Sequence, residues 1–260
     1  TATSSFTIQS GAQLTPISDE GDYTFGPGTF TLNGSGPFSG PFAAFPGAIR
    51  QNTNIPITIN NPVFLESDTL LHVQGAATGS LTFPNSVSGP GRLSLTAFPH
   101  DANLGTLVLQ GANSYAGGTI VNGGNLLLSG AAGGLGSGNI EVISASLSFF
   151  GASARLTLAT GVLNGIADNA TLALSGGNSP DFADDGYIDL QDGVNETIGA
   201  LLLARAPQLP GTYGSSASAA TFKLDEFFAG TGVITVIPEP GAAALLLAGF
   251  GALAATRRRR

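Results

Sequence analysis

Residues 105–130 read GTLVLQGANSYAGGTIVNGGNLLLSG, and this stretch decides the expected fold. Apolar residues alternate with others at Leu107 and Leu109, and again at Leu126 and Leu128. A period of two is typical of a short β-strand with one buried face. The residues between the two pairs are rich in Gly and Asn, which favour turns. The stretch therefore predicts two strands joined through a turn-rich corner.

The same apolar pattern recurs along the chain at intervals of roughly twenty residues, which is typical of a repeat architecture. Further pairs are Leu147 with Phe149, Leu156 with Leu158, Leu172 with Leu174, Ile188 with Leu190, and Leu201 with Leu203. A single coil cannot bury such a face alone, so successive coils must stack. The sequence therefore predicts an all-β chain that forms a right-handed parallel β-helix, or solenoid.

Three segments are expected along the chain. Residues 1–104 hold short β-like pieces separated by Gly-Pro, Asn-Gly and Asn-Pro turns, and we expect them to form the N-terminal part of the solenoid. The pieces lie at residues 6–8, 23–25, 30–32, 57–59, 70–73 and 81–83. Residues 105–236 are expected to continue the solenoid, and residues 237–260 to form a separate tail.

Part of the second segment resembles the autotransporter-associated β-strand repeat. The resemblance is carried by Gly111, Ala112, Asn113, Tyr115, Gly117, Gly118, Thr119, Val121, Asn122 and Gly124. Weaker likeness to such bacterial proteins extends to residues 193–203, 210–216 and 228–236. The resemblance implies a β-helix of the passenger type, which is carried outside the cell.

The tail reads IPEPGAAALLLAGFGALAATRRRR and has three parts in a fixed order. The triplet Pro238, Glu239 and Pro240 favours an extended segment that cannot join a helix or a sheet ladder. The apolar run 241–255 predicts a short hydrophobic helix of about 22 Å, against about 30 Å of bilayer hydrocarbon. Four basic residues close the tail: Arg257, Arg258, Arg259 and Arg260. By the positive-inside rule this basic end would stay in the cytoplasm.

This order resembles the PEP-CTERM sorting signal of exported proteins of Gram-negative bacteria. The resemblance implies that an exosortase-type membrane protease recognises Pro238, Glu239 and Pro240 and removes the tail. Residues 241–255 and the arginines would then hold the protein at the inner membrane only transiently. An ordinary C-terminal membrane anchor is the alternative reading of the same residues.

Composition limits the partners and the chemistry. Residues 1–237 hold sixteen acidic and five basic residues, a balance that disfavours nucleic acid as a partner. The chain has no Cys, which excludes disulfides, thiolate nucleophiles and Cys-ligated metals. It also has no Met, and we therefore expect that a signal peptide was removed before Thr1.

Acidic residues cluster in DFADDGYIDLQDG, where Asp181, Asp184 and Asp185 are weak candidates for binding Ca²⁺. Close carboxylates can wrap this ion, but the spacing does not match an EF-hand loop, so a solvated turn is the simpler reading. The same carboxylates could form a glycosidase pair. No basic residue lies between Arg155 and Arg205 to assist one.

The two histidines and the Gly-rich stretch are also explained without a catalytic or ligand-binding role. His72 lies in an expected strand, and His100 lies beside Asp101 in a turn, but no nucleophile is marked for them, so both are read as surface histidines. The Gly-rich residues 130–138 lack the Lys-Ser/Thr end of a phosphate-binding loop and are read as a solenoid corner.

Taken together, the sequence predicts an exported, non-enzymatic protein of the cell surface or extracellular matrix that needs no cofactor. Its outward polar residues could contact exopolysaccharide through many weak hydrogen bonds. Two alternatives stay open: a secreted polysaccharide-degrading enzyme on the same scaffold, and a fragment of a larger adhesin passenger.

Overall fold

The described part of the protein consists of β-strands and turns. A computed structural model describes residues 5–16, 22–25, 27–37, 46–52, 55–73, 79–97, 105–131, 133–144 and 153–237. Every regular element within these ranges is a strand, which confirms the all-β prediction. The predicted hydrophobic helix at 241–255 lies outside the described residues.

The strands form four sheets, named here A to D and given in spatial order. Sheet A contains β1 (Phe6–Ile8), β3 (Phe30–Leu32), β6 (Val63–Leu65) and β9 (Val87–Ser88). Sheet B contains β20 (Ala206–Pro207), β19 (Ala200–Leu203), β16 (Thr171–Leu174), β14 (Ile140–Val142), β12 (Thr119–Val121), β10 (Leu93–Thr96), β7 (Thr69–Val73) and β4 (Ile49–Gln51). Sheet C contains β2 (Asp22–Tyr23), β5 (Ile57–Ile59), β8 (Ser80–Phe83), β11 (Thr106–Leu109), β13 (Gly124–Leu128), β15 (Ala154–Leu158), β17 (Tyr187–Leu190) and β23 (Phe228–Gly230). Sheet D contains β18 (Asn195–Ile198), β24 (Val233–Val236), β21 (Gly211–Gly214) and β22 (Phe222–Lys223).

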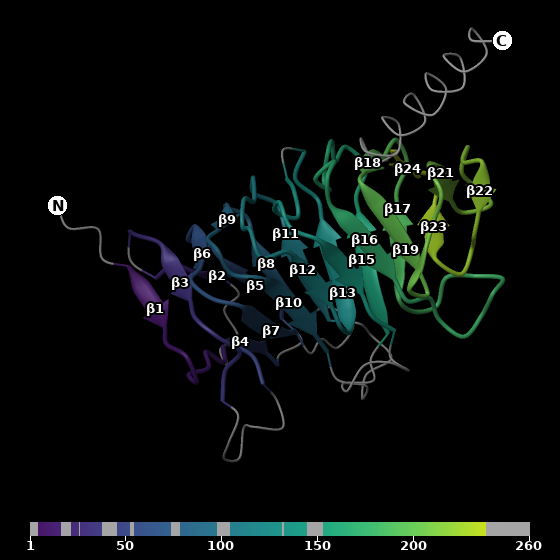
Figure 1. The fold of residues 1–260 in the computed structure, drawn as a ribbon. Coiled ribbons are helices and arrows are strands. Elements are labelled where there is room, and N and C mark those ends of the chain that lie inside the picture. Colours follow the sequence, from purple (N-terminus) through teal and green to yellow (C-terminus); the bar gives the residue numbers. More distant parts are fainter. Residues whose placement is uncertain are drawn as a thin grey trace, which may run out of the picture.

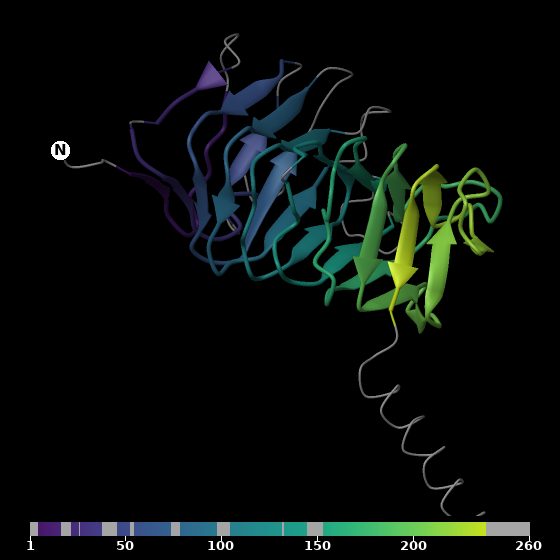
Figure 2. The ribbon, with the colours of Figure 1, turned by 90° about the horizontal axis from the view of Figure 1, so that it is seen from above.

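From β3 to β11 the chain visits sheets A, B and C in turn, and from β12 to β17 it alternates between sheets B and C (Figure 1). Except for β20, the strands of sheets A, B and C pair in parallel with the strand one coil away, for example β10 with both β7 and β12. Figure 2 shows the coils stacked one behind another along a single axis. This is the arrangement of a parallel β-helix, and its right-handed sense stays a prediction.

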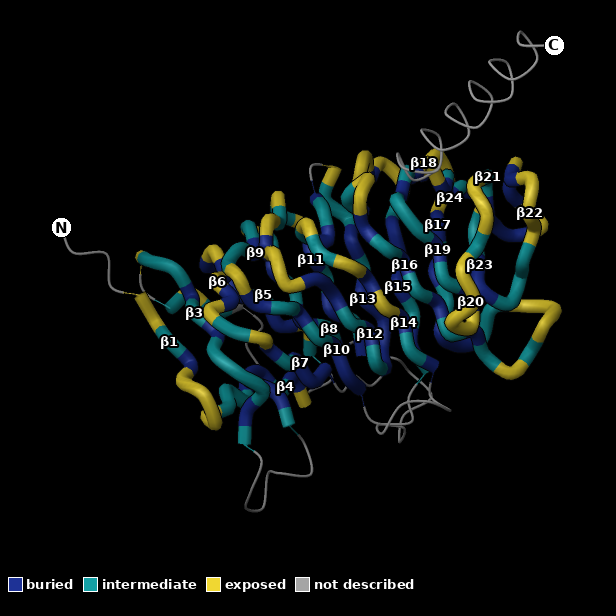
Figure 3. Tube along the Cα trace, in the orientation of Figure 1, coloured by how far each residue is buried: buried dark blue, intermediate teal, exposed yellow. Residues whose placement is uncertain are grey.

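The core is a set of apolar ladders on the inner faces of the sheets. In sheet C, Leu81 pairs with Leu107, which pairs with Leu126, and Leu156 continues the ladder to Ile188. All five side chains are fully buried. Figure 3 shows how buried positions alternate with partly exposed ones along the strands, while the most exposed residues gather at turns. Full burial of a Leu or Ile side chain stabilises a fold by about 1.5–3 kcal/mol, so this ladder favours regular stacking.

The apolar pairs do not form the one regular series that the sequence suggested. Leu107 and Leu156 belong to sheet C, whereas Leu172 and Leu201 pair with each other in sheet B. The spacing also varies, because pairing fixes only the register of the strands and leaves the connecting corners free in length. The pair Leu147 and Phe149 lies outside the described residues.

The N-terminal strands confirm most of the sequence prediction, since β1, β3 and β5 have the expected bounds. Their end of the core is aromatic. The ring of Phe25 stacks on Phe6 at 4.7 Å and on Phe30 at 4.8 Å between centroids. Sheets B and C continue without a break from this region into residues 105–236, since β8 pairs with β11 and β10 with β12.

The last coil has a different pattern from the others. Strand β20 turns back antiparallel to β19, and β21 pairs antiparallel with β24. Pro207 lies in β20, and because proline has no N–H it leaves one position of this edge unable to donate to a further strand. We call this region, residues 200–237, the closing end.

Candidate functional site

Asn113, in the repeat-like stretch, joins three successive coils. Its Oδ1 accepts a hydrogen bond from the N–H of Val87 in the preceding coil at 2.9 Å. Its Nδ2 donates to the carbonyl of Gly134 in the following coil, also at 2.9 Å. At this corner, the side chain of Asn113 links the neighbouring coils by hydrogen bonds, as backbone pairing does along the strands.

Tyr115 fills the interior of the same corner. It is fully buried, and its hydroxyl lies 2.6 Å from Oγ1 of Thr119. The Thr119 hydroxyl also donates to the carbonyl of Leu135, at 3.3 Å. Burial raises the pKa of Tyr115, so the phenol stays neutral and hydrogen-bonded. Thr119 therefore anchors the next coil from within the core, and Tyr115 holds the Thr119 hydroxyl in place.

The glycines of the motif allow two coils to touch. A Cβ on Gly117 would lie 2.4 Å from the backbone nitrogen of Arg92, in the preceding coil. Gly118 has a φ of +85°, and a Cβ there would lie 2.4 Å from the carbonyl oxygen of Asn139 in the following coil. Only glycine fits both the contact and the left-handed backbone.

The Gly-rich stretch 130–138 lies between β13 and β14 and forms the corner that stacks on Tyr115. A Cβ on Gly136 would lie 2.2 Å from the carbonyl oxygen of Tyr115. The N–H of Leu135 donates to the carbonyl of Gly165 in the next coil at 2.8 Å. This agrees with the interpretation of the stretch as a solenoid corner.

Glu196 is a coil-joining residue that the sequence analysis did not identify. It is 2% exposed, and its two carboxylate oxygens accept hydrogen bonds from the N–H groups of Gly165 and Ile166, each at 2.9 Å. Burial raises the pKa of Glu196; the two backbone hydrogen bonds oppose this rise, and nearby Asp168 adds to it. The alternation of β18 was the available signal, because Glu196 lies on the same side as the buried Ile198.

The acidic stretch has a structural use at one position. Asp185 is buried, and its Oδ1 accepts a hydrogen bond from the N–H of Ala154 at 2.7 Å. Asp181 is exposed and Asp184 is half-buried beside Gly177. Across the described ranges, no group of three or more His, Asp or Glu side chains is placed to hold a metal ion.

The interpretation of His72 as a surface residue is wrong. Its side chain is fully buried in β7, between Arg50 of β4 and Thr96 of β10 in the register of sheet B. Period-two alternation placed His72 opposite the buried Leu71, but the outer face of sheet B is covered at this point. His100 and Asp101 lie outside the described residues.

The sorting motif cannot be placed, since Pro238, Glu239, Pro240 and the arginines Arg257, Arg258, Arg259 and Arg260 lie outside the described residues. The point where the chain leaves the described body is clear. Strand β24 ends at Val236, and Ile237 is 39% exposed while its N–H still donates to the carbonyl of Ile198. Within the described ranges, no helix has the length and apolar character needed to cross a membrane.

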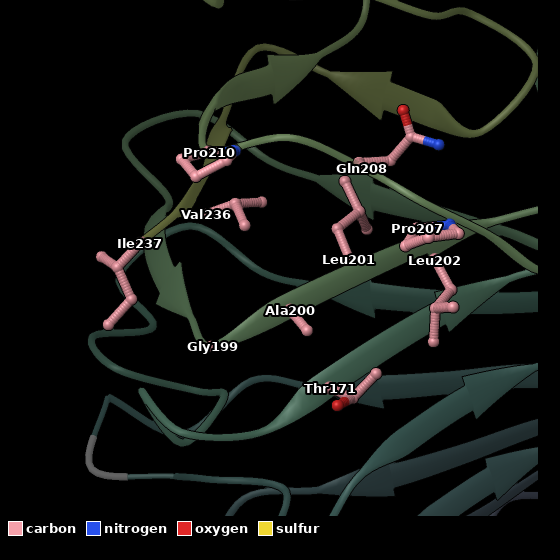
Figure 4. A pocket seen from close by; sticks show the side chains of 10 residues that line it. All are labelled: Thr171, Gly199, Ala200, Leu201, Leu202, Pro207, Gln208, Pro210, Val236 and Ile237. Carbon is pink, nitrogen blue, oxygen red and sulfur yellow. The ribbon is translucent and has the colours of Figure 1, made fainter. Parts of the chain in front are cut away.

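A groove of about 320 Å³ lies at the closing end, beside this exit point (Figure 4). Its walls are mainly apolar and come from β16, β19, β20, β24 and the segment that follows β20. The lining residues are Thr171, Gly199, Ala200, Leu201, Leu202, Pro207, Gln208, Pro210, Val236 and Ile237. The sequence analysis did not identify this groove, because its walls come from segments that only the tertiary structure brings together.

Comparison with known proteins agrees with the geometry of the corner. A family model described as the passenger-associated-transport-repeat matches residues 102–128, which include Asn113, Tyr115 and Thr119. This match confirms the predicted repeat and indicates a passenger-type protein of the bacterial surface. No curated protein and no solved structure matches the chain. The match covers a small part of the chain, so what is identified is the repeat within a longer parallel β-structure.

Proposed function

We propose that this protein is a non-enzymatic, exported structural or adhesive protein of the cell surface or extracellular matrix of a Gram-negative bacterium. The observation that carries the proposal is the use of the repeat motif. Asn113 and Thr119 bind neighbouring coils, Tyr115 holds the Thr119 hydroxyl from within the core, and the match to the passenger-associated repeat covers these residues. Residues used in this way build a rigid rod and leave function to its outer surface.

The outer surface of the rod suits many weak contacts with matrix polysaccharide. Outward strand positions carry small hydroxyl side chains, such as Thr31 in sheet A, Ser94 in sheet B and Thr82 in sheet C. Each hydroxyl can both donate and accept a hydrogen bond. Many such contacts on one stiff scaffold give avidity, even though each contact is weak.

The tail supplies the proposed route to the surface. An exosortase-type protease would recognise Pro238, Glu239 and Pro240 while residues 241–255 engage the inner membrane. The exposed position of Ile237 at the end of the last strand supports access to this site. Deletion of residues 238–260 should abolish surface placement in cells. A second variant replaces the four arginines by serine and keeps the triplet. It tests the contribution of the basic end to surface placement separately from that of the recognition motif.

Mass spectrometry of the C-terminus from cells tests processing directly. A mature terminus near residue 238 supports the sorting proposal, whereas an intact Arg260 supports an ordinary anchor. For the non-enzymatic assignment, the purified protein should leave acidic and neutral exopolysaccharides uncut. Cleavage that disappears in D184N and D185N would overturn this assignment in favour of an enzyme on the same scaffold.

A further inference from the structure

Sheet B carries a straight row of outward side chains. Strand pairing places Ser94 of β10 beside Ile120 of β12, and Ile120 beside Glu141 of β14. The row continues through Ala173 of β16 to Leu202 of β19. Each of the five is at least partly exposed, whereas both of its neighbours on the same strand are buried. We call these five residues the outer row, and it crosses the strands along the length of the rod (Figure 3).

Three hollows follow one another along the outer row. The first, of about 440 Å³, is lined by Arg92, Ile120 and Glu141 together with nearby corner residues. The second, of about 290 Å³, is lined by Glu141, Ala173 and Leu202 among others. The third is the groove at the closing end, which shares Leu202 with the second. Because each hollow shares a lining residue with the next, together they suit a linear polymer better than a compact molecule.

Two opposite charges face the second hollow. Glu141 and Arg205 both line it, and both are exposed. Neither side chain forms a salt bridge or a hydrogen bond with another residue of the described ranges, whereas Arg92 in the first hollow is paired with Asp68 at 2.9 Å. A hydroxyl group can donate to a carboxylate and accept from a guanidinium. The two charges therefore favour an uncharged ligand rich in hydroxyl groups over an ion, which one of them would repel.

The turn that carries Arg205 has an unfavourable backbone. Ala204 and Arg205 connect β19 to the antiparallel β20, and their φ angles are +47° and +69°. Two-residue hairpin turns of this kind normally use Asn-Gly, because residues with a Cβ adopt the left-handed region at a cost. Glycine at position 205 would remove the strain but also the guanidinium. This strain favours a use for the Arg205 side chain at the hollow.

The floor of the hollows matches the chemistry of a sugar chain. Ile120 and Leu202 offer aliphatic surface, and the polar residues Asn139 and Thr171 stand at the sides of the first and third hollows. A pyranose ring likewise has apolar C–H faces and hydroxyl groups around its edge. Neighbouring strands lie about 4.8 Å apart, which is close to the length of one unit in an extended 1,4-linked chain. Successive sugar units can therefore meet successive coils.

We infer that the outer row of sheet B is a binding groove for an extended, uncharged polysaccharide, with about one sugar unit per coil. The inference rests on the proposed function and deepens it, because it names the face that contacts matrix polysaccharide and the class of polysaccharide. Glu141 accepts hydrogen bonds from the sugar hydroxyls and Arg205 donates to them. Ile120 and Leu202 pack against the C–H faces of the rings.

Affinity electrophoresis of the full-length protein tests the groove. Native gels contain glucomannan, xylan or mixed-linkage β-glucan as neutral probes, and alginate or polygalacturonate as acidic ones. We expect retardation by at least one neutral gel. E141A/R205A leaves the net charge unchanged and should weaken this binding about tenfold or more, as should L202A. L127A is the matched control and should bind normally, because Leu127 is also a partly exposed leucine but lies in β13 of sheet C. Circular dichroism checks that each variant is folded.

The outcomes separate the groove from the proposed function. If E141A/R205A and L202A bind as well as L127A, the groove is refuted and polysaccharide contact elsewhere on the outer surface stands. Retardation by the acidic gels alone refutes the uncharged ligand. If no gel retards the protein, both the groove and the contact with polysaccharide are refuted.

The length of the ligand provides a second measurement. Four strand steps separate β10 from β19, or about 19 Å. Calorimetric titration with oligosaccharides of the retarding polymer should show an affinity that rises from two to about four units and then levels off. A disaccharide that binds as tightly as a hexasaccharide would overturn the arrangement of one unit per coil.

Discussion

Replacing Asn113 with alanine tests whether the repeat motif holds the coils together. The substitution removes the acceptor for the N–H of Val87 and the donor to the carbonyl of Gly134, both at 2.9 Å. A buried backbone group that loses its partner costs about 1–3 kcal/mol. Because both bonds are partly buried, we expect N113A to lower the free energy of unfolding by about 2–4 kcal/mol.

The variant N113D divides this loss between the two neighbouring coils. Aspartate keeps an acceptor for the N–H of Val87 but cannot donate to the carbonyl of Gly134. We therefore expect N113D to be less destabilised than N113A. The amide proton of Val87 should stay protected from hydrogen exchange in N113D and become unprotected in N113A.

Urea unfolding of the full-length protein, followed by far-ultraviolet circular dichroism, measures the free energies. Asn195 provides the matched control, because it is exposed and its Nδ2 donates only to the nearby carbonyl of Gly193, at 3.3 Å. N195A should change the stability by less than about 0.5 kcal/mol. The reasoning is refuted if N113A is as stable as N195A, or if the Val87 amide stays protected in N113A.

Three further substitutions, with G134A as the control for the first, examine other contacts within and between coils. G117A should cost about 2 kcal/mol or more in urea unfolding, because its Cβ meets backbone at 2.4 Å, whereas G134A, with 3.8 Å of space, should be tolerated; equal losses would contradict this. Y115F should cost about 1 kcal/mol through the lost hydrogen bond to Thr119, and no loss would show that the bond is weak. For Glu196, burial raises the folded-state pKa above 4.5, so its contribution to stability is full below pH 4.5 and is lost as the pH rises through the folded-state pKa. E196Q removes this titration, so its stability relative to the unsubstituted protein should improve as the pH rises through the folded-state pKa of Glu196; a constant difference would contradict the shift.

The sequence by itself determined the fold class and the repeat. Alternation such as that of Leu126 and Leu128 fixes which side chains are inward, because successive side chains of a strand point to opposite faces. The residues that match the passenger repeat were also visible in the sequence, since Asn113, Tyr115 and the glycines are local signals. The strand bounds of β1, β3 and β5 followed from the same local pattern.

Only the tertiary structure decided which coils pair and what the polar residues do. Leu156 and Leu172 show the same alternation, yet they belong to different sheets because successive strands of the chain alternate between sheets C and B. His72 is buried against strand neighbours that are distant in sequence, so its local pattern misplaced it. The burial of Glu196 follows the alternation of β18, but its partners Gly165 and Ile166 are supplied only by the tertiary structure. The groove at the closing end also depends on the tertiary structure, since antiparallel pairing of β21 with β24 brings Pro210 close to Val236 and Ile237.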